Sequence, residues 1–302
     1  MGTNDRFIRE DSRTDVAIMS ETTQSLLSPI TEEEKENRKR VPKKHRDYKP
    51  KYEVKTIRIL SMGAGVNTTA MLLKYGKTGR WDYCVFADTG AEVQETYDYI
   101  EKYLKPFCKE CNLPWVTVRH ISGLNIWDYY MSKGTLPLKK TRECTRAFKI
   151  EPINRFARTQ GGTPESPMVT ELGICSDEEW RANMTQYDKP YIVKRWPFCH
   201  EDPTTRNQCY EIIKDAGWPP PIKSGCDFCM FKPRSWFHKM AVEKPERFAE
   251  FVQLEKNDRR YPKYPLDGRA LLQNIIDNAT LDAKKIPDDK MAVGCKDGSC
   301  GV

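Results

Sequence analysis

Short apolar runs alternate along the chain with segments in which apolar positions recur every three or four residues. A continuous apolar run predicts a strand covered on both faces, and the three-to-four spacing predicts a helix that covers it. Strands are expected at residues 55–60, 81–87, 114–118, 168–172 and 191–196, with helices at 70–75, 93–107 and 150–158. This order predicts an α/β fold, a Rossmann-like parallel sheet of about five strands with right-handed crossovers and flanking helices.

Residues typical of helix ends follow in the second half of the chain. Ser176, followed by Glu179 three residues on, forms a capping-box pattern. Thr205 is placed to cap a helix that Gly217 ends, and the prolines at 219–221 predict a rigid connector. Further helices are expected at 236–255 and 271–279. This part of the chain therefore predicts a helical accessory region.

These patterns divide the chain into four parts. Residues 1–54 are polar and charged, so they predict a disordered tail with almost nothing to bury. Residues 55–200 form the predicted α/β domain, 201–285 the accessory region, and 286–302 a flexible tail that contains cysteine. The basic stretch 39–51 has two interpretations: a solubilising segment, which is preferred, or an arm that contacts nucleic acid.

A loop rich in glycine and hydroxyl groups follows the first strand and begins the first helix. Gly63 and Gly65 allow a sharp bend or the close approach of a ligand. Thr68 or Thr69 is placed to cap the helix, whose first backbone N–H groups suit an anionic phosphate. The loop therefore predicts a phosphate site.

Two common phosphate loops do not match this segment. A P-loop would have lysine where Asn67 stands, and a dinucleotide fingerprint would have glycine in place of Thr68. The segment resembles a PP-loop, which reads Ser-Gly-Gly-x-Asp-Ser in its commonest form. Ser61, Gly63, Gly65 and Thr68 keep that character, and Asn67 takes the place of the aspartate. The alternative is a tight turn without a ligand.

Charged residues follow the predicted strands. Asp88 ends the second strand, at the edge where parallel sheets bind ligands, and would accept bonds from a ribose or hold a metal. Its alternative role is an Asx-turn. Arg146 and Lys149 lie three apart on a predicted helix and would share a face, either as a phosphate clamp or as a solvated basic surface. Arg181 is expected to face the same crevice.

Eleven cysteines in a large chain without a secretory signal favour thiol, metal or redox chemistry over disulfides. Cys226 and Cys229 have the C-x-x-C spacing that lets two thiolates bind one metal. With Cys144 and Cys209 the set reaches four, enough for a 4Fe–4S cluster or a tetrahedral Zn²⁺ site.

Composition adds limits rather than a function. The chain has 302 residues and a net charge of +7, which is compatible with nucleotides or nucleic acid. No apolar run approaches the roughly 20 residues of a membrane span, and the N-terminus lacks a signal-peptide core. The sequence therefore predicts a cytoplasmic protein without a membrane partner.

Five motifs in order carry a family resemblance: SMGAGV at 61–66, FADTG at 86–90, CTRAFKIEP at 144–152, GICSDE at 173–178 and PPIKSGCDFC at 220–229. Together they resemble the phosphoadenosine phosphosulfate (PAPS) reductase-like branch of the adenine nucleotide alpha hydrolase superfamily, in the form common in phages and mobile elements. The resemblance implies an adenine nucleotide bound over the PP-loop. Relatives include enzymes of DNA phosphorothioation with an iron–sulfur cluster on cysteines, which supports grouping Cys144, Cys209, Cys226 and Cys229.

The leading hypothesis is an enzyme that cleaves the α–β phosphate bond of ATP with Mg²⁺ and adenylates an acceptor for sulfur transfer. The acceptor would be DNA or tRNA, and a cysteine desulfurase is a candidate sulfur donor. The PP-loop would cradle the pyrophosphate, Arg146 and Lys149 would offset its charge, and Asp88 would orient the ribose.

Two alternatives remain open. A sulfonucleotide reductase would use Cys300 as its nucleophile, with Cys295 as a second thiol in the tail. The tail reads Ser-Cys-Gly-Val, however, and lacks the Glu and His that accompany the cysteine in sulfonucleotide reductases. The other alternative is a non-catalytic nucleotide-binding subunit of a DNA modification or defence system. Both tail cysteines are equally compatible with inert surface residues.

Overall fold

The structure is a computed structural model that describes residues 56–139, 141–182, 189–263, 265 and 271–274. Every described residue belongs to one compact unit, Lys55–Val302. The predicted tails and most of the helix predicted at 271–279 lie outside the described residues.

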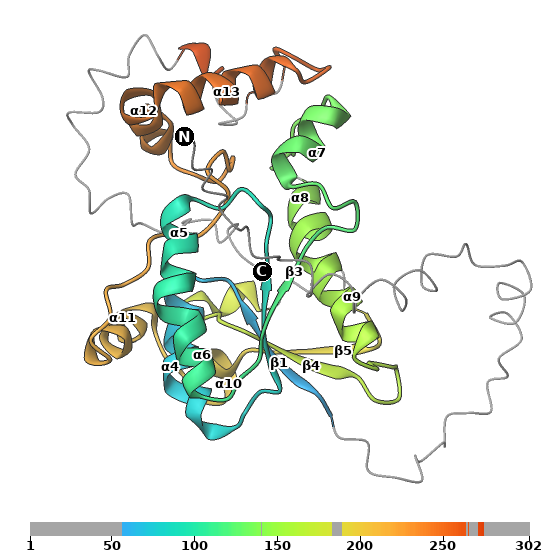
Figure 1. Ribbon diagram of the computed structural model, residues 1–302, viewed down its shortest axis with the longest axis vertical. Coiled ribbons are helices and arrows are strands. Elements are labelled where there is room, and N and C mark those ends of the chain that lie inside the picture. Colours follow the sequence, from blue (N-terminus) through green and yellow to red (C-terminus); the bar gives the residue numbers. More distant parts are fainter. Residues whose placement is uncertain (1–55, 140, 183–188, 264, 266–270, 275–302) are drawn as a thin grey trace, which may run out of the picture. The chain divides into compact units, whose positions relative to one another are not determined.

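Five strands form one parallel sheet in the order β3-β2-β1-β4-β5 (Figure 1). Their bounds are β1 Arg58–Met62, β2 Tyr83–Ala87, β3 Trp115–Val118, β4 Met168–Leu172 and β5 Ile192–Arg195. In the register, Leu60 of β1 pairs with Cys84 of β2 and Glu171 of β4. The predicted α/β class and the five-stranded parallel sheet are confirmed.

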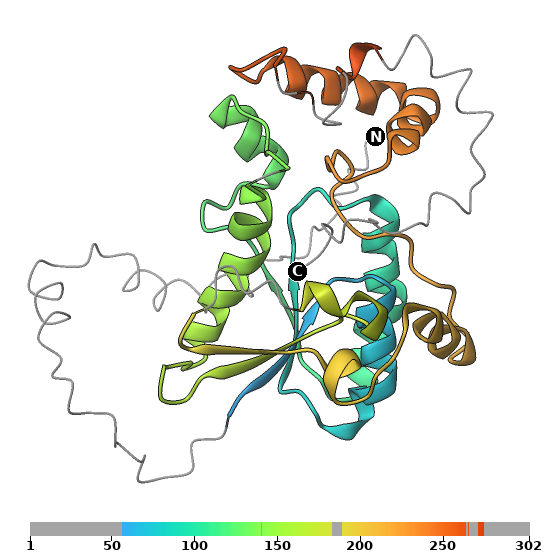
Figure 2. The same cartoon turned by 180° about the vertical axis from the view of Figure 1, so that it is seen from behind.

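Helices cover both faces of the sheet, as Figures 1 and 2 show from opposite sides. Their bounds are α4 Val66–Tyr75, α5 Gln94–Tyr99, α6 Lys105–Glu110, α9 Glu151–Thr159 and α10 Pro197–His200. A further helix, α11 (Arg206–Asp215), packs against α4. Leu60 packs in the cluster under α4, whereas its neighbour Ile59 packs in the cluster with Ile153 of α9. Successive strand residues point to opposite faces, so an apolar run satisfies both layers.

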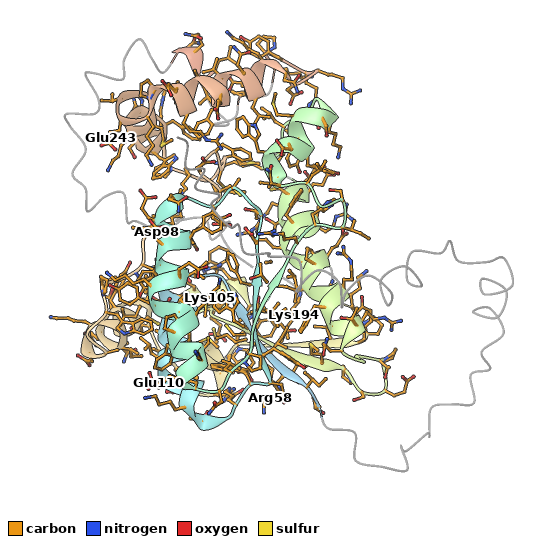
Figure 3. All side chains as sticks on the ribbon, viewed as in Figure 1. Arg58, Asp98, Lys105, Glu110, Lys194 and Glu243 are labelled. Carbon is orange, nitrogen blue, oxygen red and sulfur yellow. The ribbon has the colours of Figure 1, made fainter. Side chains whose placement is uncertain are left out.

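One predicted helix, 93–107, is continuous but not uniform. A π-helical turn, η3 (Ile100–Leu104), joins α5 to α6, and the segment extends to Glu110. Its inner face buries Leu104, whereas Asp98 and Glu110 are exposed on the outer face (Figure 3). The apolar spacing therefore predicted the buried face even though the helix changes its winding.

Two predictions about helix ends are wrong, and one is confirmed. Ser176 does not cap through its side chain, because the N-cap of the 3₁₀ helix η5 (Ser176–Arg181) is Cys175. The helix predicted at 236–255 is two helices, α12 (Arg234–Glu243) and α13 (Pro245–Lys256), since a proline cannot continue a preceding helix. Thr205 does form a capping box with Gln208 at the start of α11.

The accessory helices share a core with α7 (Ile126–Lys133) and with the segment that carries the C-x-x-C pair. Phe237 of α12 and Phe251 of α13 pack in one buried cluster with Tyr130 of α7 and Phe228. Short helical segments, α8 (Glu143–Thr145), η4 (Arg146–Ile150) and η2 (Gly76–Thr78), complete the described elements. No helix in the described ranges is long and apolar enough to cross a membrane.

Candidate active site

A cavity of about 440 Å³ lies where the loops after β1, β2 and β4 meet the segment 221–233. Ligands of open parallel sheets bind at this carboxyl edge of the strands, and the volume is that of a small-molecule site. Every residue predicted in the PP-loop lines the cavity: Ser61, Gly63, Gly65, Asn67 and Thr68. The loop that the sequence singled out is therefore part of this cavity.

The loop begins helix α4 without a side-chain cap. Gly65 is the N-cap, so the predicted cap by Thr68 or Thr69 is wrong; the Thr68 hydroxyl instead donates to the Gly65 carbonyl oxygen at 3.2 Å. Ala64 has a φ of 53°, a left-handed conformation that non-glycine residues rarely adopt. The first-turn N–H groups of a helix have no partner within the helix, so they suit an anion in the cavity.

At two positions, Gly173 and Gly65, neighbouring atoms lie so close to the backbone that a larger side chain would be crowded. A Cβ on Gly173, after β4, would lie 2.6 Å from the Thr68 Cγ2 atom and 2.9 Å from its backbone nitrogen. A Cβ on Gly65 would lie 3.2 Å from the Ser224 hydroxyl. The first turn of α4 is thus held between the end of β4 and the segment that precedes the C-x-x-C pair.

Two arginines lie beside the first turn of α4. Arg181 Nη1 donates to Glu178 Oε2 at 2.8 Å, and Asn67 Nδ2 donates to the same oxygen at 3.2 Å. Arg206 Nη1 is 3.5 Å from Asn67 Oδ1. Glu178 and both arginines line the cavity, which confirms the expectation that Arg181 faces it. Nothing in the sequence marks Arg206, which follows a helix cap, as part of the site.

Asp88 is engaged within the protein. Its Oδ2 accepts bonds from Arg119 Nη2 at 2.8 Å and Nε at 3.0 Å, and its Oδ1 accepts from Tyr97 Oη and Gly90 N, both at 2.8 Å. The bond to Gly90 is the Asx-turn that the sequence allowed as the alternative. Burial and the Asp88 carboxylate raise the pKa of Tyr97 above its ordinary value. The carboxylate is not among the residues that line the cavity.

Arg146 and Lys149 do not share a face. Lys149 lines the 440 Å³ cavity, whereas Arg146 lines a second cavity of about 540 Å³ and pairs with Glu151 at 3.1 Å. Both belong to η4, a π-helical turn, in which the wider winding separates residues that an α-helix would place together. The predicted phosphate clamp is therefore not formed by this pair.

Three thiols, those of Cys144, Cys226 and Cys229, line one side of the cavity, which we call its thiol side. Lys149 lines the cavity with them. Its Nζ lies 3.2 Å from Glu92 Oε1. Burial raises the pKa of Cys144 to about 11 and that of Cys226 well above its ordinary value. The thiol group of Cys226 donates to Thr89 Oγ1 at 3.4 Å.

A second lysine on this side was not predicted. Lys232 is 6% exposed, lines the cavity and donates to the Lys223 carbonyl oxygen at 3.2 Å, with its ammonium group 4.2 Å from the Trp236 ring centre. Burial lowers its pKa. Only its position three residues after Cys229 could have suggested it.

The four cysteines predicted as metal ligands do not come together. Cys209 lies in the cluster under α4, with its Sγ 3.4 Å from that of Cys175. In the ranges that the structure describes, no group of three or more His, Cys, Asp or Glu side chains is arranged to hold a metal ion. Cys144, Cys226 and Cys229 line one cavity and have the ligand chemistry of a metal or cluster site, so a metal held by these three stays a prediction. Cys295 and Cys300 lie outside the described residues.

Comparisons with known proteins leave the family open. No protein-family model matches the chain. Over 74 residues it is 32% identical to an uncharacterized protein of Methanocaldococcus jannaschii. This matched segment covers 24% of this chain and only 16% of that relative's length.

Two solved structures are similar at low identity. One is the PAPS reductase of Candida auris in complex with phosphate, with a TM-score of 0.40, 14% identity, and coverage of 54% of this chain and 74% of that one. The other is the U34-tRNA thiolase NcsA of Methanococcus maripaludis with its 4Fe–4S cluster, with a TM-score of 0.40, 13% identity, and coverage of 77% and 73%. Similarity at this level identifies neither the ligand nor the reaction of this chain.

Proposed function

We propose that the chain is a PAPS reductase-like enzyme that binds ATP in the 440 Å³ cavity and cleaves it between the α and β phosphates. The observation that carries this proposal is the lining of one cavity by the PP-loop residues, Arg181, Arg206 and three thiols. A sulfide-level sulfur nucleophile would then form a C–S bond at the activated carbon of the adenylated acceptor, and AMP would leave with the electrons of the broken C–O bond. Membership of the PAPS reductase-like family, on the five sequence motifs, is part of the proposal.

The phosphates would lie at the first turn of α4. Gly63 and Gly65 leave room for close approach there, and the N-terminal end of a ten-residue helix favours negative charge. Arg181 and Arg206 lie beside this turn and would offset the charge of the departing pyrophosphate. They take the role that the sequence suggested for Arg146 and Lys149.

The adenine would lie against the apolar part of the lining, which strand ends and α9 provide. Met62 ends β1, Phe86 and Ala87 end β2, and Ile153 belongs to α9. Pockets for planar ligands are commonly apolar, with a few polar groups that fix orientation. Asp88 takes no part in this proposal, because the groups around it already engage both carboxylate oxygens.

The proposed step is an adenylyl transfer. An oxygen of the acceptor attacks the α-phosphorus, and pyrophosphate leaves with the electron pair of the broken P–O bond, while the acceptor proton passes to solvent. Mg²⁺ needs only one or two carboxylates when phosphates supply its other ligands, so it fits a site without a dedicated cage. It would neutralise charge on the phosphates.

The thiols on the same cavity favour sulfur chemistry over adenylation alone. Cys144, Cys226 and Cys229 line it together with the PP-loop, so an acceptor that is adenylated there would be near these thiols. DNA or tRNA is the proposed acceptor class, with Lys223 and Lys239 among the cations that line the cavity. The sulfur donor would be a separate protein.

The test is product analysis with the full-length chain. Purified protein with ATP and Mg²⁺ should release pyrophosphate and AMP, because water can replace the acceptor at the α-phosphorus, and nucleic acid should stimulate pyrophosphate release. Chromatography measures both products. Arg181→Met and Arg206→Met should each slow it by roughly a hundredfold, the scale for loss of one group that stabilises transition-state charge. The exposed Arg195→Met, on β5, is the matched control. Release of ADP and phosphate alone would refute the proposal.

A further inference from the structure

Glu178 occupies an anion-binding position at the first turn of α4. One carboxylate oxygen, Oε2, accepts a bond from Asn67 Nδ2 at 3.2 Å and another from Arg181 Nη1 at 2.8 Å. The Glu178 side chain is 20% exposed and that of Arg181 11%, and both line the cavity. These two donors are of the kind that bind phosphate, and here they bind a carboxylate.

The backbone of η5 brings this carboxylate to the loop. Glu178 has φ −120° and ψ 20°, which interrupts the helix between two 3₁₀ turns. The preceding residue, Asp177, accepts instead from the backbone nitrogen of Arg206 at 3.1 Å, at the start of α11. The adjacent carboxylates therefore bind different partners. Asp177 accepts a hydrogen bond from the start of α11, and Glu178 accepts one from the first turn of α4.

We infer that Glu178 sets the affinity and charge preference of the cavity for phosphate, by holding the position between Asn67 and Arg181 that a phosphate group would take. A nucleotide whose phosphate enters there displaces the carboxylate, and Arg181 then binds the phosphate. The inference rests on the proposed function, because it concerns the phosphate end of the same cavity.

The physical reason is competition between two anions for the same donors. Carboxylate and phosphate both gain from an arginine and from the positive end of a helix, and they repel each other when close together in a partly buried site. Phosphate binding must therefore also overcome the bonds that Glu178 makes. Neutralising Glu178 while keeping its shape removes the repulsion and weakens the bonds to Asn67 and Arg181, because an amide oxygen is a weaker acceptor than a carboxylate.

The experiment is calorimetric titration of the full-length chain with three probes: ATP, inorganic pyrophosphate and adenosine, each with and without Mg²⁺. Glu178→Gln should bind ATP and pyrophosphate about tenfold more tightly than the parent, a difference of about 1.4 kcal/mol. Adenosine, which has no phosphate, should bind with unchanged affinity. The control is Glu179→Gln, because Glu179 is 59% exposed and pairs with His200 at 3.4 Å.

A second variant separates charge from shape. Glu178→Asp keeps the charge and should not bind ATP more tightly, whereas Glu178→Ala should resemble Glu178→Gln; thermal unfolding of each variant checks that it folds. If the parent binds ATP and Glu178→Gln binds it no more tightly, the inference is wrong and the proposed function stands. Weaker binding of Glu178→Gln only with Mg²⁺ would make the carboxylate a metal ligand and overturn the displacement. A folded parent that binds none of the three probes would overturn both.

Discussion

The ammonium group of Lys149 lies 3.2 Å from the carboxylate of Glu92, whose side chain is 1% exposed. Burial opposes the charged form of Lys149, but Glu92, together with the Cys226 and Cys229 thiols, outweighs this effect and raises the pKa of Lys149 above its ordinary value. Lys149 is therefore charged at neutral pH, and Glu92 depends on it for charge compensation. A residue predicted to bind phosphate already has a structural partner.

Lys149→Met should destabilise the chain by about 3 kcal/mol, because it leaves the Glu92 carboxylate buried and unpaired. Glu92→Gln in the same chain should restore part of this loss, since the uncompensated charge is then gone. The measurement is urea denaturation of both single variants, the double variant and the parent.

The control for this set of single and double variants is Lys105→Met, because Glu101, the ion-pair partner of Lys105, is 65% exposed. Removing an exposed ion pair of this kind should change the free energy of unfolding by less than about 1 kcal/mol. If the double variant is no more stable than Lys149→Met, the pair does not couple in this way. ATP binding, measured on the folded samples, shows whether Lys149 also contributes to ligand binding in the cavity that it lines.

Gly173→Ala should disturb the PP-loop from outside it. Its new Cβ would lie 2.9 Å from the backbone nitrogen of Thr68, so the first turn of α4 would have to move. We expect a loss of about 1–3 kcal/mol in the free energy of unfolding, the usual scale for overpacking, and weaker ATP binding.

Gly63→Ala is the matched stability control for this prediction. Its Cβ would lie 3.9 Å from the Thr68 hydroxyl oxygen, which is an ordinary van der Waals contact. Thermal unfolding should therefore separate the two alanine variants, with Gly173→Ala the less stable. Equal melting temperatures would show that the end of β4 does not hold α4 in place.

The sheet could be predicted from the sequence because its signal is local. Continuous apolar runs such as Tyr83–Ala87 can be satisfied only between two layers, and β2 lies within the predicted range 81–87. The PP-loop was found for the same reason, since its glycines lie within a few residues of one another. Such features need no knowledge of distant contacts.

The site beyond the loop depends on contacts between distant segments, which spacing does not encode. Two residues that lie three apart share a face only on an α-helix. Arg146 and Lys149 belong to a π-helical turn, Arg146–Ile150, and they line different cavities. Cysteine spacing likewise could not show that Cys209 packs against Cys175 instead of joining the C-x-x-C pair. The contact of Glu178 with Asn67 spans 111 residues.

Glu171→Ala should destabilise the chain strongly and leave the cavity intact. The Glu171 side chain is fully buried, and it accepts bonds from Arg80 at 2.6 and 2.9 Å, from Trp81 at 2.8 Å and from Arg58 at 2.9 Å (Arg58 is labelled in Figure 3). Loss of the carboxylate leaves Arg58 and Trp81 without this acceptor and leaves Arg80 only its bond to Glu201, and it should cost about 3–5 kcal/mol.

Urea denaturation measures this loss, and ATP binding to the folded fraction should be unchanged, because Glu171 does not line the cavity. Glu201→Ala is the comparison, since Glu201 also pairs with Arg80 but is 38% exposed. A cost for Glu171→Ala no larger than that for Glu201→Ala would show that burial does not strengthen the cluster.

Cys199 should resist alkylation in the folded chain. Its thiol donates to the Ile174 carbonyl oxygen at 3.3 Å, and burial raises its pKa to about 11. In the unfolded chain a cysteine titrates near an ordinary value of about 8.5, so at pH 8 only the unfolded chain has a substantial thiolate fraction. Because the folded pKa is the higher one, the stabilising effect is complete below about pH 8.5 and is lost as the pH rises towards 11.

Iodoacetamide labelling followed by peptide mass spectrometry measures this for Cys199 alone. At pH 8 the folded chain should be labelled at Cys199 far more slowly than the same chain in urea, and the native rate should climb between pH 9 and about 11. Free cysteine in the same solution controls for the reagent. Rapid native labelling at pH 8, at the rate seen in urea, would mean that the packing of Cys199 against the end of β4 does not persist in solution.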